Sequence, residues 1–306
     1  MVCDLCGSID FSPLSQVDRK GRPLVTGICN HCGLISHIPL PSEEEIARYY
    51  AQQYRNDYHG ERTPSDRRIM RAWNNGERIC NQIKDYLSKQ TDVFEIGAGI
   101  GCTVKQFELH GFRATGIEPN HDFNAFTREK LHANVENTNL FDLTPDHQYN
   151  AILLIHVIEH FVSPSKALQH IHALLKEGGL LYVECPNVAG PFATFDRLFH
   201  YAHIYNFAHV TLQQIAHKCG FELVQSFTDD GHPDLQMLFR KSTPSQPAIE
   251  ADQSEKIRQA TQRFGMLSYH LRPAYLSRRL KKVASYAWEY AVAPGFVRKL
   301  LLRTQS

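Results

Sequence analysis

The chain has 306 residues, a formal net charge of +1 and a hydrophobic content of 42%. This near-neutral balance lacks the basic excess of dedicated nucleic-acid-binding proteins, and no apolar run approaches the ~20 residues of a membrane-spanning helix. The length suffices for one substantial core with smaller satellite units. We therefore expect a globular protein of several parts, with no specific nucleic-acid partner.

Two C-x2-C motifs open the chain, and a glycine follows each of them: the pairs are Cys3 with Cys6 and Cys29 with Cys32. The tight turn of each motif points backbone amides at sulfur, and four thiolates complete the tetrahedral coordination of zinc without leaving an open position. The pattern resembles a zinc ribbon. It predicts one structural Zn²⁺ held by a domain at residues 1–40.

Other uses of these cysteines are less well supported. A redox dithiol needs only one pair, and a disulfide framework needs an oxidising compartment, whereas the first cysteine follows Met1 too closely for a secretory leader. We therefore expect a cytoplasmic protein, with the remaining cysteines as buried core thiols: Cys80, Cys102, Cys185 and Cys219.

Residues 41–90 are predicted to be a helical linker. Ser42 and Glu45 form a capping box, which predicts the start of a helix there. Aromatic residues follow it at helical spacing: Tyr49, Tyr50, Tyr54 and Tyr58. Such a stripe more often packs against a core than covers a ligand, and both interpretations stay open. Residues 67–87 are predicted as the helix before the first core strand.

An apolar strand at residues 93–96 leads into a turn with glycines at alternating positions: Gly97, Gly99 and Gly101. Glycine lets a ligand approach bare backbone, and the amides at the following helix start can donate to it. A dinucleotide fold needs G-x-G-x-x-G, and Cys102 stands where the third glycine of that pattern belongs. Glu95 precedes the turn and places a carboxylate where it can help hold a cationic ligand.

More polar residues follow the later strands. A short second strand ends at Glu118, and an acidic loop contains Asp142. An apolar strand at residues 150–155 leads into the sequence H-V-I-E-H at residues 156–160, and a Gly-Gly turn at residues 174–180 precedes the next strand.

In this order the motifs resemble those of the class I S-adenosylmethionine-dependent methyltransferases. The E-x-G-x-G-x-G turn resembles their first motif, and the H-V-I-E-H segment is similar to the one after their fourth strand. The resemblance implies an α/β, Rossmann-like sheet of seven mostly parallel strands, with the methyltransferase core at residues 91–242 and its last two strands at 221–227 and 235–239.

The resemblance also implies the residues that bind S-adenosylmethionine. In this family the acid at the position of Glu118 hydrogen-bonds the ribose hydroxyls, and the acidic loop contacts adenine. The predicted cofactor-binding residues are Glu95, Gly97, Gly99, Gly101, Glu118, Asp142 and His156.

Residues 195–207 form an aromatic and histidine-rich loop before a predicted helix at 211–219. Loops at the carboxyl ends of parallel strands build the ligand crevice, so the acceptor is expected there. A hydroxyl or carbon acceptor must lose a proton, and histidine is the natural base near neutral pH. The nearby histidines are His156, His160, His200, His203 and His209. Among them His160 and His203 are the candidate catalytic residues.

Residues 243–306 are predicted to be a basic helical appendage. From residue 255 onward there are eleven Lys or Arg against two acids, a balance of +9, which leaves −8 for the rest of a chain whose total is +1. Three interpretations remain open: helices packed on the core, a docking surface for an anionic partner, and shallow contact with a membrane. The oligomeric state is also open.

A ribbon joined to this core is similar to the sugar C-methyltransferases that act on nucleotide-linked deoxysugars. The chain departs from them, because their loop has Tyr and Glu shortly before its histidine and their third domain is much longer. We therefore predict methylation of a small carbohydrate-type acceptor at a hydroxyl, in a surface-glycan or natural-product pathway. The alternatives are N- or C-methylation of another small molecule, and a non-catalytic binding module.

Overall fold

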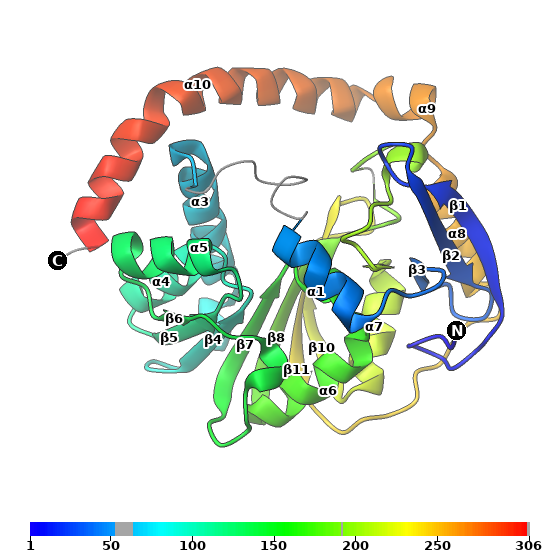
Figure 1. The fold of residues 1–306 in the computed structure, drawn as a ribbon, viewed down its shortest axis with the longest axis horizontal. Coiled ribbons are helices and arrows are strands. Elements are labelled where there is room, and N and C mark those ends of the chain that lie inside the picture. Colours follow the sequence, from blue (N-terminus) through cyan, green and yellow to red (C-terminus); the bar gives the residue numbers. More distant parts are fainter. Residues whose placement is uncertain (53–63, 191, 305–306) are drawn as a thin grey trace.

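A seven-stranded sheet forms the centre of the fold, in the order β10-β11-β8-β7-β4-β5-β6 (Figure 1). The computed structural model describes residues 1–52, 64–190 and 192–304. Only β11 runs antiparallel to its neighbours. The strands are β4 (Asp92–Ile96), β5 (Arg113–Ile117), β6 (Val135–Glu136), β7 (Tyr149–Ile155), β8 (Leu175–Pro186), β10 (Phe221–Ser226) and β11 (Asp234–Lys241). The predicted Rossmann-like sheet is confirmed.

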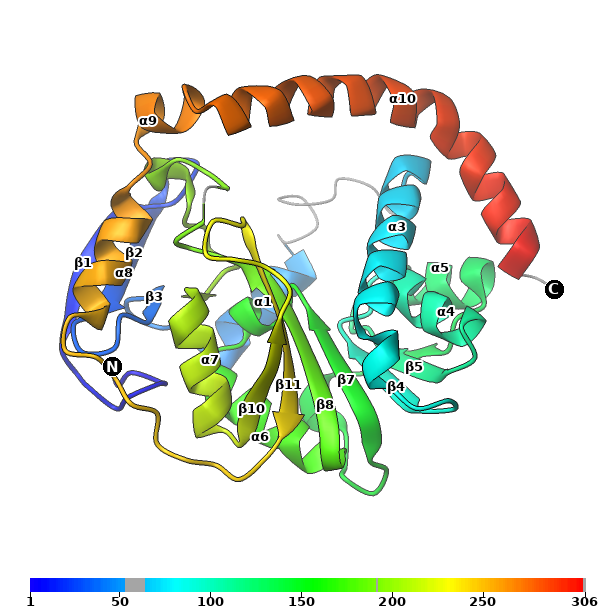
Figure 2. The same cartoon turned by 180° about the vertical axis from the view of Figure 1, so that it is seen from behind.

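Helices cover both faces of this sheet (Figures 1 and 2). One layer contains α3 (Asp66–Ile83), α4 (Cys102–Leu109) and α5 (His121–Phe126), and the other contains α6 (Pro164–Leu174) and α7 (His209–Lys218). Since both faces are covered, the central strands are nearly continuous apolar runs. Short helical segments complete the core: Lys84–Tyr86, Thr127–Leu131, Leu140–Asp142, Ile158–His160 and Phe195–Arg197.

The sequence predicted the start of the first helix correctly. The capping box at the start of α1 (Glu43–Gln52) is confirmed, because the Ser42 amide donates to the Glu45 carboxylate at 2.8 Å and the Glu45 amide donates to the Ser42 hydroxyl at 3.1 Å. Tyr49 is buried, with its ring centroid 4.9 Å from that of Tyr201. Tyr54 and Tyr58 lie outside the described residues.

The strand after the Gly-Gly turn begins earlier than predicted. β8 starts at Leu175, ahead of Gly178, because Tyr149 of β7 already pairs with Leu175 across an irregularity in the ladder. Gly178 has φ of +70° within this irregular start. The turn and the strand therefore overlap.

The cysteine motifs adjoin a second sheet of four strands, β1-β2-β3-β9, and Cys29 is the last residue of its inner strand β2. Its strands are β1 (Phe11–Val17), β2 (Pro23–Cys29), β3 (Ile35–His37) and β9 (Tyr205–Asn206). The last strand comes from the histidine-rich loop of the core and pairs antiparallel with β3. The amino-terminal unit and the core thus share one sheet.

Helix α8 (Gln253–Gln262) also packs on this unit. The Gln253 side chain donates to the Cys32 carbonyl at 2.7 Å, and the Ser254 hydroxyl donates to the Cys29 carbonyl at 2.9 Å. At Gly33 an added Cβ would come within 2.5 Å of the Ile257 side chain. The first part of the region after residue 243 is therefore in close contact with the cysteine-containing unit.

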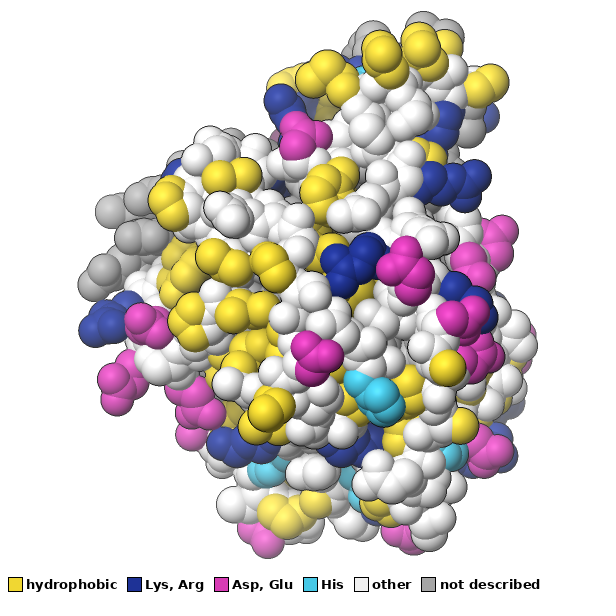
Figure 3. All heavy atoms as spheres, turned by 90° about the vertical axis from the view of Figure 1, so that its right-hand side faces the viewer, with side chains coloured by type: hydrophobic (Ala, Val, Ile, Leu, Met, Phe, Trp, Pro, Cys, Tyr) yellow, Lys and Arg dark blue, Asp and Glu magenta, His cyan; other side chains and the backbone are white. Residues whose placement is uncertain are grey.

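The chain ends in α9 (Met266–His270) and the long helix α10 (Pro273–Thr304), which arches across the carboxyl edge of the central sheet towards α3 and α4 (Figures 1 and 2). Its distal end is anchored, because Val297 is buried and Glu289 lies 3.4 Å from the Arg67 guanidinium. Hydrophobic side chains gather at the α9 end of the face in Figure 3, and the exposed ones in this region include Met266, Leu267, Leu271 and Leu276.

Helix α8 and the distal part of α10 therefore pack on the rest of the protein. Contact of this region with an anionic partner or with a membrane stays a prediction. Among the described residues, none of the helices combines the length and the apolar run that crossing a membrane requires.

Candidate functional site

The glycine turn connects β4 to α4, as predicted. All three glycines adopt positive φ, +71° at Gly97, +55° at Gly99 and +74° at Gly101. An added Cβ would lie 2.7 Å from Val157 at Gly97 and would clash with Thr127 at Gly101, whereas at Gly99 no atom lies within 4 Å. Two glycines are therefore required by packing, and the middle one leaves backbone open to a ligand.

Glu118, which directly follows β5, is hydrogen-bonded to this turn. Its carboxylate accepts hydrogen bonds from the Gly99 amide at 2.8 Å and from the Asn120 amide at 2.7 Å. Burial raises the pKa of the Glu118 carboxyl, and these two amides oppose the shift. Each carboxylate oxygen can accept a further hydrogen bond, so the side chain can also contact ligand hydroxyls.

The two other predicted acidic contacts differ in environment. Glu95 is almost fully buried, and burial raises its pKa to about 8. One of its oxygens has no hydrogen-bond partner among the described residues. Asp142 is exposed and accepts a hydrogen bond from the Asn139 side chain at 3.1 Å. Cofactor contact by Glu95 and Asp142 stays a prediction.

Beside the turn, three imidazoles surround one carboxylate, and we call this group the Glu159 cluster: Glu159, His156, His160 and His203. The distances from Glu159 Oε1 are 3.6 Å to His156 Nδ1, 3.9 Å to His160 Nε2 and 3.8 Å to His203 Nε2. The two candidate catalytic histidines therefore lie together, and their ring centroids are 5.0 Å apart.

The backbone of the motif after β7 explains this convergence. His156 has φ of +55°, an unusual conformation for a residue other than glycine and one that clusters at functional sites. Its amide donates to the Glu184 carbonyl at 2.7 Å, and the helical turn Ile158–His160 follows. Val157, between them, lies against Gly97. The cluster thus adjoins the glycine turn.

The pKa values of the residues in the Glu159 cluster are shifted in different directions. Burial opposes charge on His156, but the carboxylates of Glu159 and Glu184 outweigh it and raise its pKa to about 9. Burial likewise opposes ionisation of Glu159, yet His156 and His160 lower its pKa. Burial and the imidazoles of His200 and His160 hold the pKa of His203 well below its usual range. His203 is therefore a neutral imidazole near neutral pH, and its low pKa makes it a weaker base than an ordinary histidine.

The sequence did not assign roles to Glu159 and Glu184. Glu184 lies on β8, where Arg78 Nη2 approaches it at 2.6 Å and the Tyr182 hydroxyl donates to it at 2.9 Å. Its Oε1 lies 3.7 Å from His156 Nε2. A buried strand acid carries no local motif, whereas the H-x-x-E-H spacing was a usable signal for Glu159.

The loop after β8 supplies the rest of the cluster's surroundings. The Ala202 carbonyl accepts a hydrogen bond from His160 Nδ1 at 2.7 Å. The ring centroids of His200 and His203 are 3.8 Å apart. The amide of His37, in the amino-terminal unit, donates to the Ile204 carbonyl at 3.0 Å. His209 lies elsewhere, 3.3 Å from the Ser226 hydroxyl.

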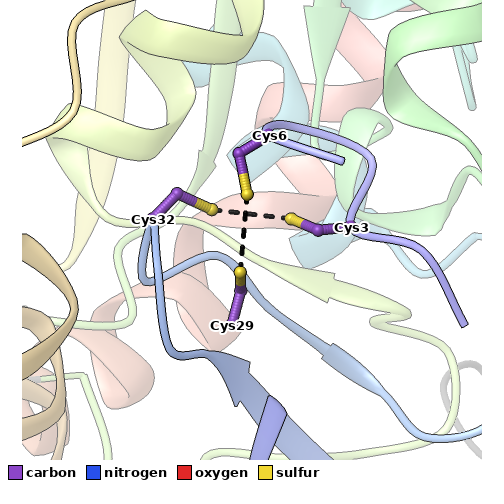
Figure 4. A group of neighbouring side chains, drawn as sticks. All are labelled: Cys3, Cys6, Cys29 and Cys32. Atoms are coloured by element: carbon purple, nitrogen blue, oxygen red, sulfur yellow. Dashed lines mark hydrogen bonds between the residues drawn. The ribbon is translucent and has the colours of Figure 1, made fainter. Parts of the chain in front are cut away.

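The four amino-terminal cysteines converge as their spacing predicts, with their sulfur atoms directed at a common centre (Figure 4). The Cys3 and Cys32 sulfurs are 3.5 Å apart, as are those of Cys6 and Cys29, and all four lie within 4.8 Å of one another. Tetrahedral zinc with bonds of about 2.3 Å needs sulfur separations of about 3.8 Å. The donor set and its spacing fit such an ion. The other four cysteines are buried.

Two cavities flank the histidine-rich loop. One, of about 1130 Å³, lies between this loop, the β10–β11 turn and α9–α10. Its cationic lining residues are Arg197, Arg263, Arg272, Arg279 and Lys282. The other, of about 380 Å³, lies between the β1–β2 hairpin, α1 and Tyr201.

Comparison with known sequences identifies relatives of the core. A family model described as a methyltransferase domain matches residues 65–226. An uncharacterized methyltransferase of Alkaliphilus oremlandii is 26% identical over 110 residues, which cover 35% of this chain and 50% of that protein. A mitochondrial ubiquinone biosynthesis O-methyltransferase of Dictyostelium discoideum is 22% identical over 137 residues, 36% of this chain and 43% of that protein. The chain spans half or less of these relatives' length.

Solved structures show the same fold. The 1,6-didemethyltoxoflavin-N1-methyltransferase of Burkholderia thailandensis, with bound 1,6-didemethyltoxoflavin and S-adenosylhomocysteine, has a TM-score of 0.51 at 17% identity, and the match covers 69% of this chain and 96% of that one. The magnesium protoporphyrin IX methyltransferase of Synechocystis, with bound S-adenosylhomocysteine, also has a TM-score of 0.51, at 12% identity, covering 66% of this chain and all of that one.

Proposed function

Because the chain belongs to the methyltransferase-domain family, we propose that it transfers the methyl group of S-adenosylmethionine to a hydroxyl of a small carbohydrate-type acceptor. One observation carries this proposal above the others. The Glu159 cluster, with its neutral imidazole, adjoins the glycine turn through the contact of Val157 with Gly97. A proton acceptor and a cradle for the cofactor therefore lie side by side.

One group of residues would bind the cofactor, and another would activate the acceptor. When bound, S-adenosylmethionine supplies an electrophilic methyl group. The turn and Glu118 would hold the cofactor, and the Nε2 atom of His203 or His160 would take the hydroxyl proton as the acceptor oxygen attacks. An amine acceptor needs no such base, so a neutral imidazole beside the cradle favours a hydroxyl.

The choice of acceptor rests on the sequence and on one cavity. The arrangement of a cysteine ribbon before this core resembles that of the sugar methyltransferases. The cavity beside the histidine-rich loop combines five cationic residues and two acids, Asp196 and Asp230, with aromatic rings such as Phe264 and Tyr269. The excess of cations and the aromatic rings suit a sugar conjugate that carries negative charge. The name of the Dictyostelium relative, an O-methyltransferase, agrees with transfer to oxygen.

We also propose that Cys3, Cys6, Cys29 and Cys32 hold one structural Zn²⁺. Four thiolates leave no position open for substrate, so the ion would contribute to folding and not to chemistry. The knuckle geometry supports this, since the Gly7 and Gly33 amides donate to the Cys3 and Cys29 carbonyls at 2.9 Å.

Cofactor binding tests the first half of the proposal. Glu118→Ala is expected to weaken S-adenosylmethionine binding ten-fold or more, because it removes charge-assisted hydrogen bonds worth roughly 1.5–3 kcal/mol and releases the Gly99 amide. Isothermal titration calorimetry measures the effect. Glu222→Ala, which removes an exposed acid on β10, should bind as the wild type does. Absence of binding by the folded wild type would end the proposal.

The pH dependence tests the base. A depressed pKa keeps His203 neutral at pH values where an ordinary histidine is already charged. As pH falls, kcat/KM should therefore decline only below about 6.5, the usual pKa of histidine. His209→Ala, outside the cluster, should leave this midpoint unchanged. A decline that begins above about pH 6.5 would exclude His203 as the base.

A further inference from the structure

Glu159 is the least satisfied buried acid of the described residues. The residue is 1% exposed, and neither carboxylate oxygen has a hydrogen-bond partner there. A buried carboxylate that lacks hydrogen bonds is costly, so such a group usually binds a cation or awaits a ligand.

The nitrogen atoms around Glu159 are spaced as metal ligands are. Its Oε1 lies 3.9 Å from His160 Nε2 and 3.8 Å from His203 Nε2, and the ligand atoms of the three residues all lie within 4.8 Å of one another. A tetrahedral ion with bonds of about 2.1 Å needs ligand separations of about 3.4 Å. The observed separations of 3.9 and 3.8 Å exceed this value by about half an ångström.

The hydrogen bond of His160 sets the orientation of its ring. A carbonyl oxygen only accepts, so the contact of 2.7 Å with the Ala202 carbonyl places a proton on Nδ1. In the neutral ring, Nε2 then carries a lone pair on the side of Glu159. Histidine ligands of metals are commonly fixed by such a bond from the other ring nitrogen to a carbonyl. A cation between Nε2 and the carboxylate would give the carboxylate a partner, which it lacks among the described residues.

We propose that Glu159, His160 and His203 bind one divalent transition-metal ion, and that this ion holds the hydroxyl oxygen of the acceptor. The proposal rests on the function proposed above and gives the cluster a chemical means of activating the acceptor. Two imidazoles and a carboxylate suit zinc, cobalt or iron. In contrast to the four cysteines, three ligands leave coordination positions open for a substrate.

His156 is the other candidate partner of the Glu159 carboxylate. Its Nδ1 is 3.6 Å from Oε1, which is too long for a hydrogen bond. His156 Nε2 also faces Glu184, at 3.7 Å. The position of His156 therefore leaves the lone pairs of the Glu159 carboxylate available to an ion.

The ion would take over the activating role proposed above for Nε2 of His203 or His160, while transfer of the methyl group to a hydroxyl is unchanged. A bound divalent ion lowers the pKa of a coordinated hydroxyl, so the acceptor proton would leave to solvent and not to an imidazole. The oxygen would then form its bond to the methyl carbon as the carbon–sulfur bond breaks, and S-adenosylhomocysteine would depart with the electron pair on sulfur.

Cobalt binding to the full-length protein tests the site. The protein retains its tightly held ribbon zinc, is passed over a chelating resin to empty weaker sites, and is titrated with Co²⁺ in a calorimeter. Zinc resists displacement from thiolates because cobalt binds more weakly. We expect one Co²⁺ per chain, with affinity at least ten-fold lower in both Glu159→Gln and His203→Ala. Glu177→Gln, which alters an exposed acid away from the cluster, should bind as the wild type does.

The outcomes separate this site from the function. Absence of a Co²⁺ site in the wild type, or a site unchanged in both cluster variants, would overturn the proposal, and His203→Ala decides the matter if Glu159→Gln does not fold. S-adenosylmethionine is titrated separately. Normal cofactor binding without cobalt binding leaves the proposed function intact, whereas cobalt binding without cofactor binding refutes the function alone.

Discussion

Replacement of His203 by alanine is expected to lower turnover by about 10²–10⁴ while the affinity for S-adenosylmethionine stays nearly unchanged. The reason is the position of its Nε2, 3.8 Å from the carboxylate of Glu159, in the cluster that adjoins the glycine turn. Whether the imidazole takes the proton itself or binds an ion, the variant loses activation of the acceptor only. His160→Ala should show a loss of the same kind, because its Nε2 faces the same carboxylate.

A methyl-transfer assay with a panel of nucleotide sugars and free glycans measures this loss, and calorimetry measures cofactor affinity in the same variants. His209→Ala provides the matched control, since this histidine contacts Ser226 outside the cluster. Near-full turnover in both cluster variants would mean that positioning alone explains the catalysis. A silent panel together with methylation of an amine would refute the carbohydrate acceptor.

Cys29→Ser should unfold the amino-terminal unit, because a closed thiolate site contributes folding free energy, about 10–16 kcal/mol for zinc-finger peptides. From the sequence alone, Cys29→Ser was expected to leave the methyl-transfer chemistry unaltered. The pairing of β3 with β9 changes that expectation, because β9 directly follows the loop that carries His203. We therefore also expect a large loss of turnover, with S-adenosylmethionine binding retained.

Metal analysis and hydrogen exchange test both parts of this result. The wild type should contain one zinc per chain, and faster exchange in the variant should extend from residues 1–40 into residues 199–207. Cys80→Ser, at a buried thiol on α3, should retain its zinc. Less than half an equivalent of zinc in wild-type protein purified without chelator would contradict the zinc assignment.

Short sequence motifs predicted the features of the fold that depend mainly on nearby residues. The capping box at Ser42 depends on neighbours within a few residues, so its sequence signal was sufficient. The glycine spacing after β4 was also readable in the sequence, although Gly97 and Gly101 are required by packing against the distant residues Val157 and Thr127. The β9–β3 pairing and the contacts of α8 with the cysteine carbonyls join segments more than 150 residues apart. No periodicity in either segment encodes such a partner.

The candidate site divides in the same way. The motif H-x-x-E-H places Glu159 and His160 in one short helical turn, and His156 precedes that turn. The arrival of His203 depends on the path of a loop whose end pairs with β3 of the amino-terminal unit. The second carboxylate, Glu184, depends on the register of β8 beside β7. The sequence motif therefore contained Glu159, and the tertiary structure brought His203 and Glu184 to it.

The shared four-stranded sheet limits how acceptor specificity can be transferred between related enzymes. Residues 205–206 add a strand to the edge of β3, so the histidine loop is completed by a unit at the opposite end of the sequence. A loop grafted alone into another core would leave that strand without its partner and His203 without a fixed position. Chimeras that test the proposed acceptor site should therefore exchange residues 1–40 and the loop at 195–207 together.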